Sequence, residues 1–234
     1  MESEWIPHMF VMCHPKYEAA RYNFLLKHFA ARGIPKEKIH YVSTLWGHEI
    51  TAEIAFDIYD PFQHRFGIKH NLSQQSVALS RGELSLMMTF HEVIRQVLEG
   101  EYSEVIIFES DIILREDFLP RLKDVLTEAA GRDWDYISLG EGVGTRPPDT
   151  HPSYFNPTKL YKPPHQWVFR CCDSMLLRRG FLEKVSKTFL PCRECLDWEM
   201  NVQAMVHRAT SWWADPPLAE PSTGRNRYMT SLPA

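Results

Sequence analysis

The sequence has no long apolar run and no excess of basic charge, and each absence argues against a class of protein. No uninterrupted apolar segment approaches the roughly 20 residues that a membrane-spanning helix needs. The opening residues Met-Glu-Ser-Glu-Trp are too acidic for a signal peptide. The net charge of -4, without a local Lys/Arg cluster, supplies no positive field for nucleic acid. We therefore expect a soluble, cytoplasmic protein with no membrane span and no nucleic-acid partner.

The five cysteines lack the pattern of a disulfide framework, because their number is odd and Cys171 and Cys172 are adjacent. Cys192 and Cys195 have CxxC spacing, but no second Cys/His pair stands at the spacing of a zinc site. Reduced thiols are the simpler interpretation, and a metal or redox role for this pair is the alternative.

The chain has 234 residues, of which 44% are hydrophobic, and this fits one compact domain over 1–234. Apolar runs and helical spacing alternate along it. Strands are expected at 9–13, 39–43, 105–108 and 134–139, and helices at 17–32, 79–98, 118–130 and 181–189. We expect a strand pair within 168–177. The alternation predicts an α/β domain.

Three segments lack this periodicity. Residues 51–76 are expected to be irregular or to form short helices, because Pro61 interrupts their pattern. Residues 142–165 are rich in Pro, Gly, Thr and His, and we predict a functional loop on the acceptor side of a site. Residues 214–234 are rich in proline and hydroxyl side chains, and a flexible C-terminal segment is expected there.

Two carboxylates stand at the end of an apolar strand pattern. Residues 105–108 are β-branched and aromatic, as in a strand buried on both faces, and Glu109 and Asp111 follow. Side chains two apart in an extended chain point the same way, so both carboxylates can meet one Mn²⁺ or Mg²⁺ ion. The alternative is an acidic loop before the next helix, because Asp117 and Pro120 follow nearby.

A second acidic pair, Asp197 and Glu199, opens a predicted helix that continues to Val206. Either carboxylate is a candidate general base, with Asp197 first and Glu199 in reserve. The alternative for Asp197 is a helix N-cap. His207 is left outside the metal set, because a lone histidine among apolar residues is more often structural.

Several motifs, taken in order, resemble glycosyltransferase family 25, the lipopolysaccharide and procollagen galactosyltransferase-like group. The resemblance spans most of the chain. It is carried by Arg21 on the first helix, Gly82-Glu83-Leu84, Phe108-Glu109-Ser110-Asp111, Asp135 to Gly140, Leu196-Asp197-Trp198-Glu199 and Pro216-Pro217-Leu218. The chain departs from the family pattern at three places: Thr89-Phe90 replaces a Ser-His pair, Glu109 replaces Asp, and Glu220 stands where Gln is common.

The resemblance implies a glycosyltransferase A-type fold, a single Rossmann-like nucleotide-sugar-binding domain with a mixed, mostly parallel sheet. It implies an inverting transfer of a hexose, most often galactose, from a UDP-sugar to a glycan or other hydroxyl acceptor. Asp111 and Glu109 would hold Mn²⁺ or Mg²⁺, and Asp197 or Glu199 would act as the base. The nucleotide-binding set would be Arg21, Thr44, Trp46, Glu83, Glu109 and Ser110.

Other interpretations stay open. Arg21 is alternatively a solvated helix charge, and Trp46 a cap on the core. The paired carboxylates also suit a glycosidase, which needs no metal. A nucleotidyltransferase is disfavoured because no glycine-rich phosphate loop stands between Met9 and Arg21. The remaining alternative is a catalytically inactive sugar- or nucleotide-binding module.

Overall fold

The computed structural model describes residues 4–60, 79–100, 102–141, 147, 156–164 and 169–222. Within these ranges, no helix has both the length and the apolar character that crossing a membrane requires.

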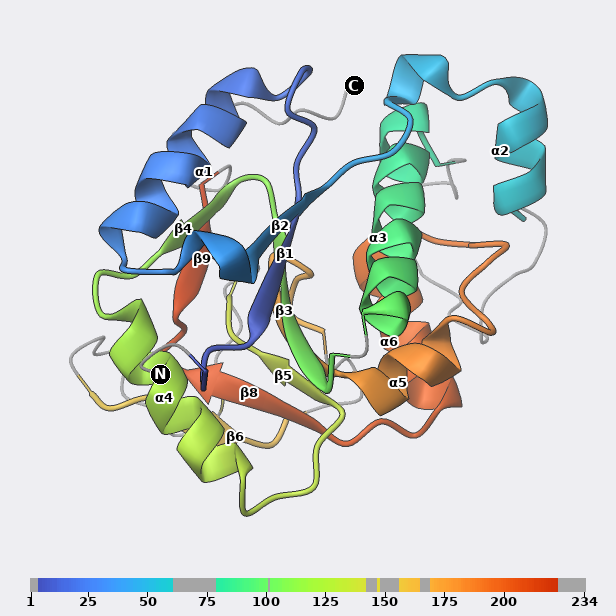
Figure 1. Ribbon diagram of the computed structural model, residues 1–234. Helices are drawn as coiled ribbons and strands as arrows, with labels where there is room; N and C mark the ends of the chain where they lie inside the picture. Colours follow the sequence, from blue (N-terminus) through green and yellow to red (C-terminus); the bar gives the residue numbers. More distant parts are fainter. Residues whose placement is uncertain are drawn as a thin grey trace.

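A twisted seven-stranded sheet forms the centre of the described fold (Figure 1). Its order is β2 (Ile39–Val42), β1 (His8–Met12), β3 (Glu104–Glu109), β7 (Ser174–Arg178), β5 (Tyr136–Ser138), β8 (Ser211–Asp215) and β6 (Lys159–Tyr161). β7 and β6 run antiparallel to their neighbours, and the other five strands share one direction. A small antiparallel pair joins β4 (Ile112–Leu114) to β9 (Ala219–Pro221).

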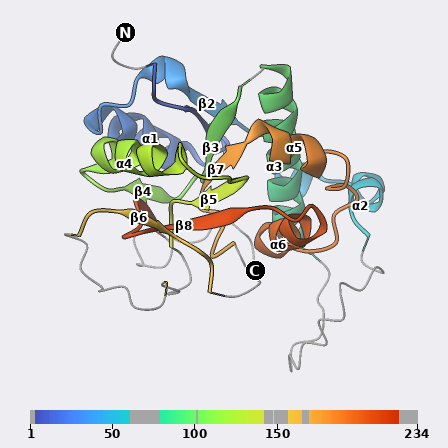
Figure 2. The same cartoon turned by 90° about the horizontal axis from the view of Figure 1, so that it is seen from below.

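Helices cover both faces of this sheet (Figures 1 and 2). One face carries α1 (Ala19–Ala31) and α4 (Phe118–Ala129), and the other carries α3 (Arg81–Glu99), α5 (Arg179–Val185) and α6 (Leu196–Val206). The short helix α2 (Ala52–Ile58) packs against α3. Two 3₁₀ turns, η1 (Lys36–Lys38) and η2 (Gly47–Glu49), flank β2.

Strand β3 divides the hydrophobic core into two layers. Val105 and Ile107 face the layer under α3, α5 and α6, whereas Ile106 and Phe108 face the layer under α1 and α4. All four side chains are fully buried. A strand that is covered on both faces has a continuous apolar sequence. This pattern at residues 105–108 is the one from which the strand was predicted. The prediction of an α/β domain with a mixed, mostly parallel sheet is confirmed, and the arrangement is compatible with a Rossmann-like fold.

One local prediction is wrong. The expected strand pair within 168–177 is a single strand, β7, because the preceding residues 169–173 follow an irregular path and Arg170 and Asp173 are buried there. The described part of the segment predicted to be flexible, residues 214–222, completes β8 and forms β9, and its flexibility stays a prediction. Leu218 donates its amide to Leu139 O at 2.7 Å and is fully buried. The expectation for 223–234 lies outside the described residues.

The predicted loop at 142–165 contains strand β6, which pairs with β8. Its residues 142–146, 148–155 and 165 lie outside the described ranges, as do residues 61–76 of the segment predicted to be irregular. The described start of that segment is helical, and Thr51 caps α2 by accepting the Ile54 amide.

Candidate functional site

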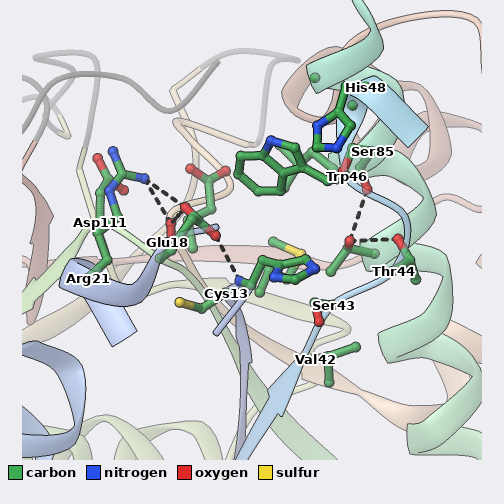
Figure 3. A pocket seen from close by; sticks show the side chains of 18 residues that line it. Cys13, Glu18, Arg21, Val42, Ser43, Thr44, Trp46, His48, Ser85 and Asp111 are labelled. Carbon is green, nitrogen blue, oxygen red and sulfur yellow. Dashed lines mark hydrogen bonds and ion pairs between the residues drawn. The ribbon is translucent and has the colours of Figure 1, made fainter. Parts of the chain in front are cut away.

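A pocket of about 490 Å³ opens at the carboxyl ends of β1, β2 and β3 (Figure 3). Parallel neighbouring strands end at the same edge of a sheet, so the residues that follow them converge there. His14, Thr44 and Asp111 come from the three strand ends, and Ser85 and Thr89 of α3 close the opposite wall. Six of the predicted site residues line this pocket: Arg21, Thr44, Trp46, Glu109, Ser110 and Asp111.

Arg21 is held in the wall by Ser110 and by Glu18, a residue that sequence reasoning missed. Arg21 Nη1 donates to Ser110 Oγ at 2.8 Å and to Glu18 Oε1 at 3.1 Å. Ser110 Oγ in turn donates to Glu18 Oε1 at 2.5 Å. The other Glu18 oxygen accepts the His14 amide at 2.8 Å. Glu18 stands three residues before Arg21, the spacing of an ion pair on one helix face, and that spacing was the available signal.

Thr44 and Trp46 mark two different parts of the pocket. Thr44 Oγ1 lies 2.9 Å from Thr89 Oγ1, which ties the end of β2 to α3. The Trp46 ring stacks on Tyr17, with 5.3 Å between ring centroids. Trp46 is only partly buried, so the interpretation of a ring facing the pocket fits better than a cap on the core.

Glu83 does not line the pocket. Its carboxylate accepts the Ser80 amide at 2.7 Å, and Ser80 Oγ accepts the Glu83 amide at 3.2 Å. This reciprocal pair is a capping box at the start of α3. The neighbouring Gly82 lies on the pocket wall instead.

Glu109 and Asp111 line the pocket, and burial raises the pKa of Glu109 well above its usual value. The carboxylates of Asp197, Asp111 and Asp173 add to this rise, and Arg21 opposes it. We call Glu109, Asp111, Asp173 and Asp197 the carboxylate cluster. The structure therefore brings Asp197, one member of the second acidic pair, to the Glu109–Asp111 pair, and adds an acid that neither pair contains.

Asp173, the residue just before β7, is the second functional candidate that sequence reasoning missed. Its side chain is fully buried, and neither carboxylate oxygen has a hydrogen-bond partner among the described residues. Burial raises its pKa to about 7, although Arg170 acts in the opposite direction. The available signal was one acid between apolar residues, in Cys171-Cys172-Asp173.

Asp197 is not a helix N-cap, so that alternative is wrong. Helix α6 begins at Leu196 with Cys195 in the cap position, and Asp197 lies inside the first turn. Its Oδ1 accepts the Cys172 amide at 2.6 Å, which fixes the carboxylate beside Glu109 and Asp173. Burial raises the pKa of Asp197, and the Cys172 hydrogen bond limits the rise.

Glu199 faces away from the cluster. It is fully buried, and its two carboxylate oxygens accept the Arg193 amide at 3.1 Å and Gln203 Nε2 at 3.0 Å. Residues two apart on a helix project about 200° apart, so Asp197 and Glu199 reach different surroundings. Of the two candidate bases, the geometry brings Asp197 to the site.

In the described ranges, no group of three or more His, Cys, Asp or Glu side chains is arranged to hold a metal ion. Cys192 and Cys195 are free thiols, as are the other three cysteines. Protein side chains alone therefore offer an ion at most a partial coordination shell at this site.

The sequence matches no family model and no curated protein sequence.

Proposed function

We propose that the chain is a metal-dependent, inverting glycosyltransferase that moves a hexose from a UDP-sugar to a glycan or other hydroxyl acceptor. The observation that carries the proposal is the pocket at the carboxyl edge of β1, β2 and β3, with the Glu109–Asp111 segment in its wall and Asp197 beside Glu109. Ligands of open α/β sheets bind at this edge. Arg21, Gly82 and the Glu109–Asp111 segment, which belong to the motifs that resemble glycosyltransferase family 25, line this pocket.

The pocket suits a nucleotide diphosphate. Arg21 supplies a guanidinium whose planar donors match phosphate oxygens. The hydroxyl groups of Thr44, Ser85 and Thr89 stand on the wall opposite the acids, where they offer polar contacts to a base or ribose. Trp46 and Tyr17 add a stacked aromatic surface next to them.

The residues present fit a divalent cation. Glu109 and Asp111 line the pocket, and Asp173 and Asp197 lie close enough to Glu109 to raise its pKa. Mg²⁺ and Mn²⁺ are commonly held by one or two carboxylates plus substrate phosphates, so the lack of a three-ligand group in the described ranges is compatible with such an ion. When bound, the ion neutralises the diphosphate leaving group. Asp111 and Glu109 are the residues we assign to it.

Asp197 is the proposed base. Its carboxylate is held by the Cys172 amide and lies at the edge of the carboxylate cluster. In this position it would accept the proton of an acceptor hydroxyl as that oxygen attacks the sugar from the face opposite the diphosphate. One in-line displacement converts an α-linked donor into a β-linked product. We assign Glu199 to the support of α6 and the 193–195 turn instead.

The first test is a screen of nucleotide-sugars for slow donor hydrolysis, with calorimetry of UDP binding in Mn²⁺ and in EDTA. We expect UDP to bind in a Mn²⁺-dependent way, and Asp111→Asn to remove most of that dependence, because an amide oxygen lacks the carboxylate charge. Asp117→Asn is the matched control, since Asp117 pairs with Arg115 and Arg121 outside the site. If folded Asp111→Asn binds UDP and Mn²⁺ as tightly as the unaltered chain does, the assignment of Asp111 as a metal ligand is wrong.

The second test separates the two carboxylates on α6. Asp197→Asn should lower sugar transfer about 10²–10⁴-fold with UDP affinity nearly unchanged, because the base acts on the acceptor side. Glu199→Gln should chiefly lower stability, by about 1–2 kcal/mol, because its contacts are internal. An α-linked product, or the transfer defect appearing in Glu199→Gln alone, would overturn this assignment.

A glycosidase is the second candidate, favoured by the raised pKa values of Glu109 and Asp197, since a glycosidase needs one carboxyl kept protonated as an acid. It would cleave glycosides without UDP and without a divalent ion.

An inactive binding module would bind UDP or a sugar but release no product from any donor.

A further inference from the structure

The hydroxyl groups of Thr44, Ser85 and Thr89 line the side of the pocket where the end of β2 meets α3. We call them the hydroxyl wall. Figure 3 shows Thr44 and Ser85 on this side of the pocket and Arg21 on the other side. A hydroxyl group has one proton to donate and two lone pairs that accept. What the hydroxyl wall offers to a ligand therefore depends on where each proton points.

The protons of the hydroxyl wall are used within the protein. Thr89 Oγ1 donates to Ser85 O at 2.9 Å, and Ser85 Oγ donates to Leu45 O at 2.6 Å, because a carbonyl oxygen can only accept. Thr89 Oγ1 also lies 2.9 Å from Thr44 Oγ1. Since the proton of Thr89 is already used, Thr44 is the donor of that bond. All three protons are thus directed away from a ligand.

The lone pairs are what the hydroxyl wall presents to a ligand. Thr44 Oγ1 and Ser85 Oγ each keep two, and Thr89 Oγ1 keeps one after it accepts from Thr44. These oxygens accept a hydrogen bond from a ligand N–H or O–H, and they repel a ligand atom that is itself an acceptor. Ser85 and Thr89 are buried, so turning either hydroxyl toward a ligand costs the bond to its carbonyl. The hydroxyl wall therefore favours donors.

The aromatic residues nearby indicate which part of a nucleotide meets this wall. Trp46 follows Thr44 by two residues and lines the same pocket, and its ring is stacked on Tyr17. A base stacks on surfaces of this kind. Arg21, whose guanidinium matches phosphate oxygens, lies on the opposite side. A nucleotide whose phosphates lie at Arg21 therefore has its base at the hydroxyl wall.

We propose that Thr44 and Ser85 determine the base specificity of the pocket by accepting a hydrogen bond from a ring N–H of the base. Uracil carries such a donor at N3. N3 of cytosine is an acceptor, and against the lone pairs of the hydroxyl wall it makes no hydrogen bond. The carbonyl groups that flank N3 in uracil need a donor instead, and Ser43, a further hydroxyl on the pocket wall, can supply one.

This inference rests on the proposed function for the choice of a nucleotide, and it adds the residues that select the base. Ser85 and Thr89 are not among the predicted nucleotide-binding residues. Thr89 also stands at a position where the chain departs from the family pattern. Their role follows from the direction of the hydrogen bonds rather than from the resemblance.

The test compares UDP with CDP by calorimetry on the full-length protein in Mn²⁺, because the two ligands differ only at the base. We expect UDP to bind at least about tenfold more tightly, since CDP leaves buried acceptors without a donor. UDP methylated at N3 has no proton there and should also bind at least about tenfold more weakly than UDP. Equal affinity for UDP and CDP, or for UDP and the methylated ligand, would overturn the proposal. These comparisons need no variant.

Variants separate a specificity role from a structural one. Ser85→Ala and Thr44→Val each remove an accepting oxygen, so the preference for UDP over CDP should fall about 3–10-fold. Thr44→Ser keeps the oxygen and should keep the preference. Ser186→Ala is the matched control, because Ser186 Oγ also donates to a carbonyl, that of Glu183, but on the exposed surface. It should change the preference by less than about twofold.

Ser85→Ala and Thr44→Val proteins that bind UDP more weakly but keep the full preference over CDP would show that these residues only support the fold, and the proposal would be wrong. UDP lacking the ribose 2′-hydroxyl tests the ribose, whose hydroxyl groups are also donors. Ser85→Ala should weaken the binding of UDP and of 2′-deoxy-UDP by the same factor. If it weakens UDP alone, the hydroxyl wall accepts from the ribose and the proposal is overturned.

The two proposals fail separately. A preference for UDP over CDP that depends on Thr44 and Ser85, in a chain that transfers no sugar from any donor, supports the base specificity and counts against the glycosyltransferase. Sugar transfer from a UDP-sugar by a chain that binds CDP as tightly as UDP supports the transferase and overturns the base specificity.

Discussion

At the scale of the residue, Glu18 holds Arg21 in place. Apart from histidines, Arg21 is the one cationic side chain among the described residues that line the pocket. It accepts hydrogen bonds from Arg21, Ser110 and the His14 amide, and its side chain is nearly buried. A long arginine that is fixed in this way loses less conformational entropy when it meets a phosphate. Glu18 is therefore a positioning residue for Arg21.

We expect Glu18→Gln to lower Mn²⁺-dependent UDP affinity about tenfold, because a neutral amide holds the guanidinium less firmly than a carboxylate does. Calorimetry measures the change. Glu92→Gln is the matched control, since Glu92 also pairs with an arginine three residues away, on the exposed surface of α3. Unchanged UDP affinity in a folded Glu18→Gln variant would remove Glu18 from the site.

His28 is a second residue of interest, because its protonation affects the stability of the fold. Its Nε2 accepts the Leu114 amide at 2.8 Å, a bond that requires the neutral ring. Burial, aided by the charge of Arg32, lowers its pKa from 6.5 to about 4. The unfolded chain therefore binds this proton more readily than the folded chain does.

The contribution of His28 to stability is complete above its unfolded pKa of 6.5 and is lost as the pH falls toward 4. The shift corresponds to about 3 kcal/mol. We expect the free energy of unfolding, measured with urea, to fall between pH 7 and pH 4 in both proteins. The fall should be about 3 kcal/mol smaller in His28→Gln than in the unaltered chain. Parallel pH profiles for the two proteins would contradict this assignment.

At the scale of the element, the capping box places the start of α3 against the pocket. Ser80 and Glu83 satisfy each other's amides, and η2 packs closely on the same turn: a Cβ on Gly47 would lie 3.1 Å from Gly82 N. The wall residues Ser85 and Thr89 follow on the next turns. The helix start thus fixes where Ser85 and Thr89 stand on the pocket wall.

We expect Ser80→Ala to lower the free energy of unfolding by about 1 kcal/mol, the usual cost of a lost N-cap. Glu83→Gln should cost less, because an amide oxygen still accepts the Ser80 hydrogen bond. Chemical denaturation of both variants measures the role of Glu83 as a helix cap, and UDP titration measures its predicted role in nucleotide binding. A Glu83→Gln protein of native stability with UDP binding lowered more than tenfold would restore Glu83 to the nucleotide-binding set.

At the scale of the whole molecule, the sheet joins two hydrophobic layers into one unit. Leu25 of α1 lies in one layer and Leu182 of α5 in the other, and both are fully buried. The strands between them contribute side chains to both layers, so neither layer is complete without the sheet.

We expect Leu25→Ala and Leu182→Ala each to lower the free energy of unfolding by about 2–5 kcal/mol. The two effects should add within about 0.5 kcal/mol, because the side chains share no contacts across the sheet. Each variant should keep a single unfolding transition by circular dichroism and fluorescence. Two separated transitions in either variant would show that the layers unfold independently.

The sequence by itself determined the main strands and helices of the fold, but not strand β8 or the short strands β4, β6 and β9. The apolar run of β3 and the helical spacing of α3 depend on local order in the chain, so both were predictable, and so was the position of Glu109 and Asp111 where β3 ends. The motifs also indicated Asp197, through a resemblance rather than through geometry.

Only the tertiary structure decided which of these residues meet. Asp173 joins Glu109 because β7 runs antiparallel beside β3, a pairing between residues far apart in the chain. Asp197 reaches the cluster and Glu199 does not, because their helix docks with one side toward the Cys172 amide. Strand β9 also lay beyond local prediction, because its proline-containing sequence lacks a strand pattern and its partner β4 lies about a hundred residues earlier in the chain. Contacts of this kind arise from packing between distant segments, and local sequence patterns do not encode them.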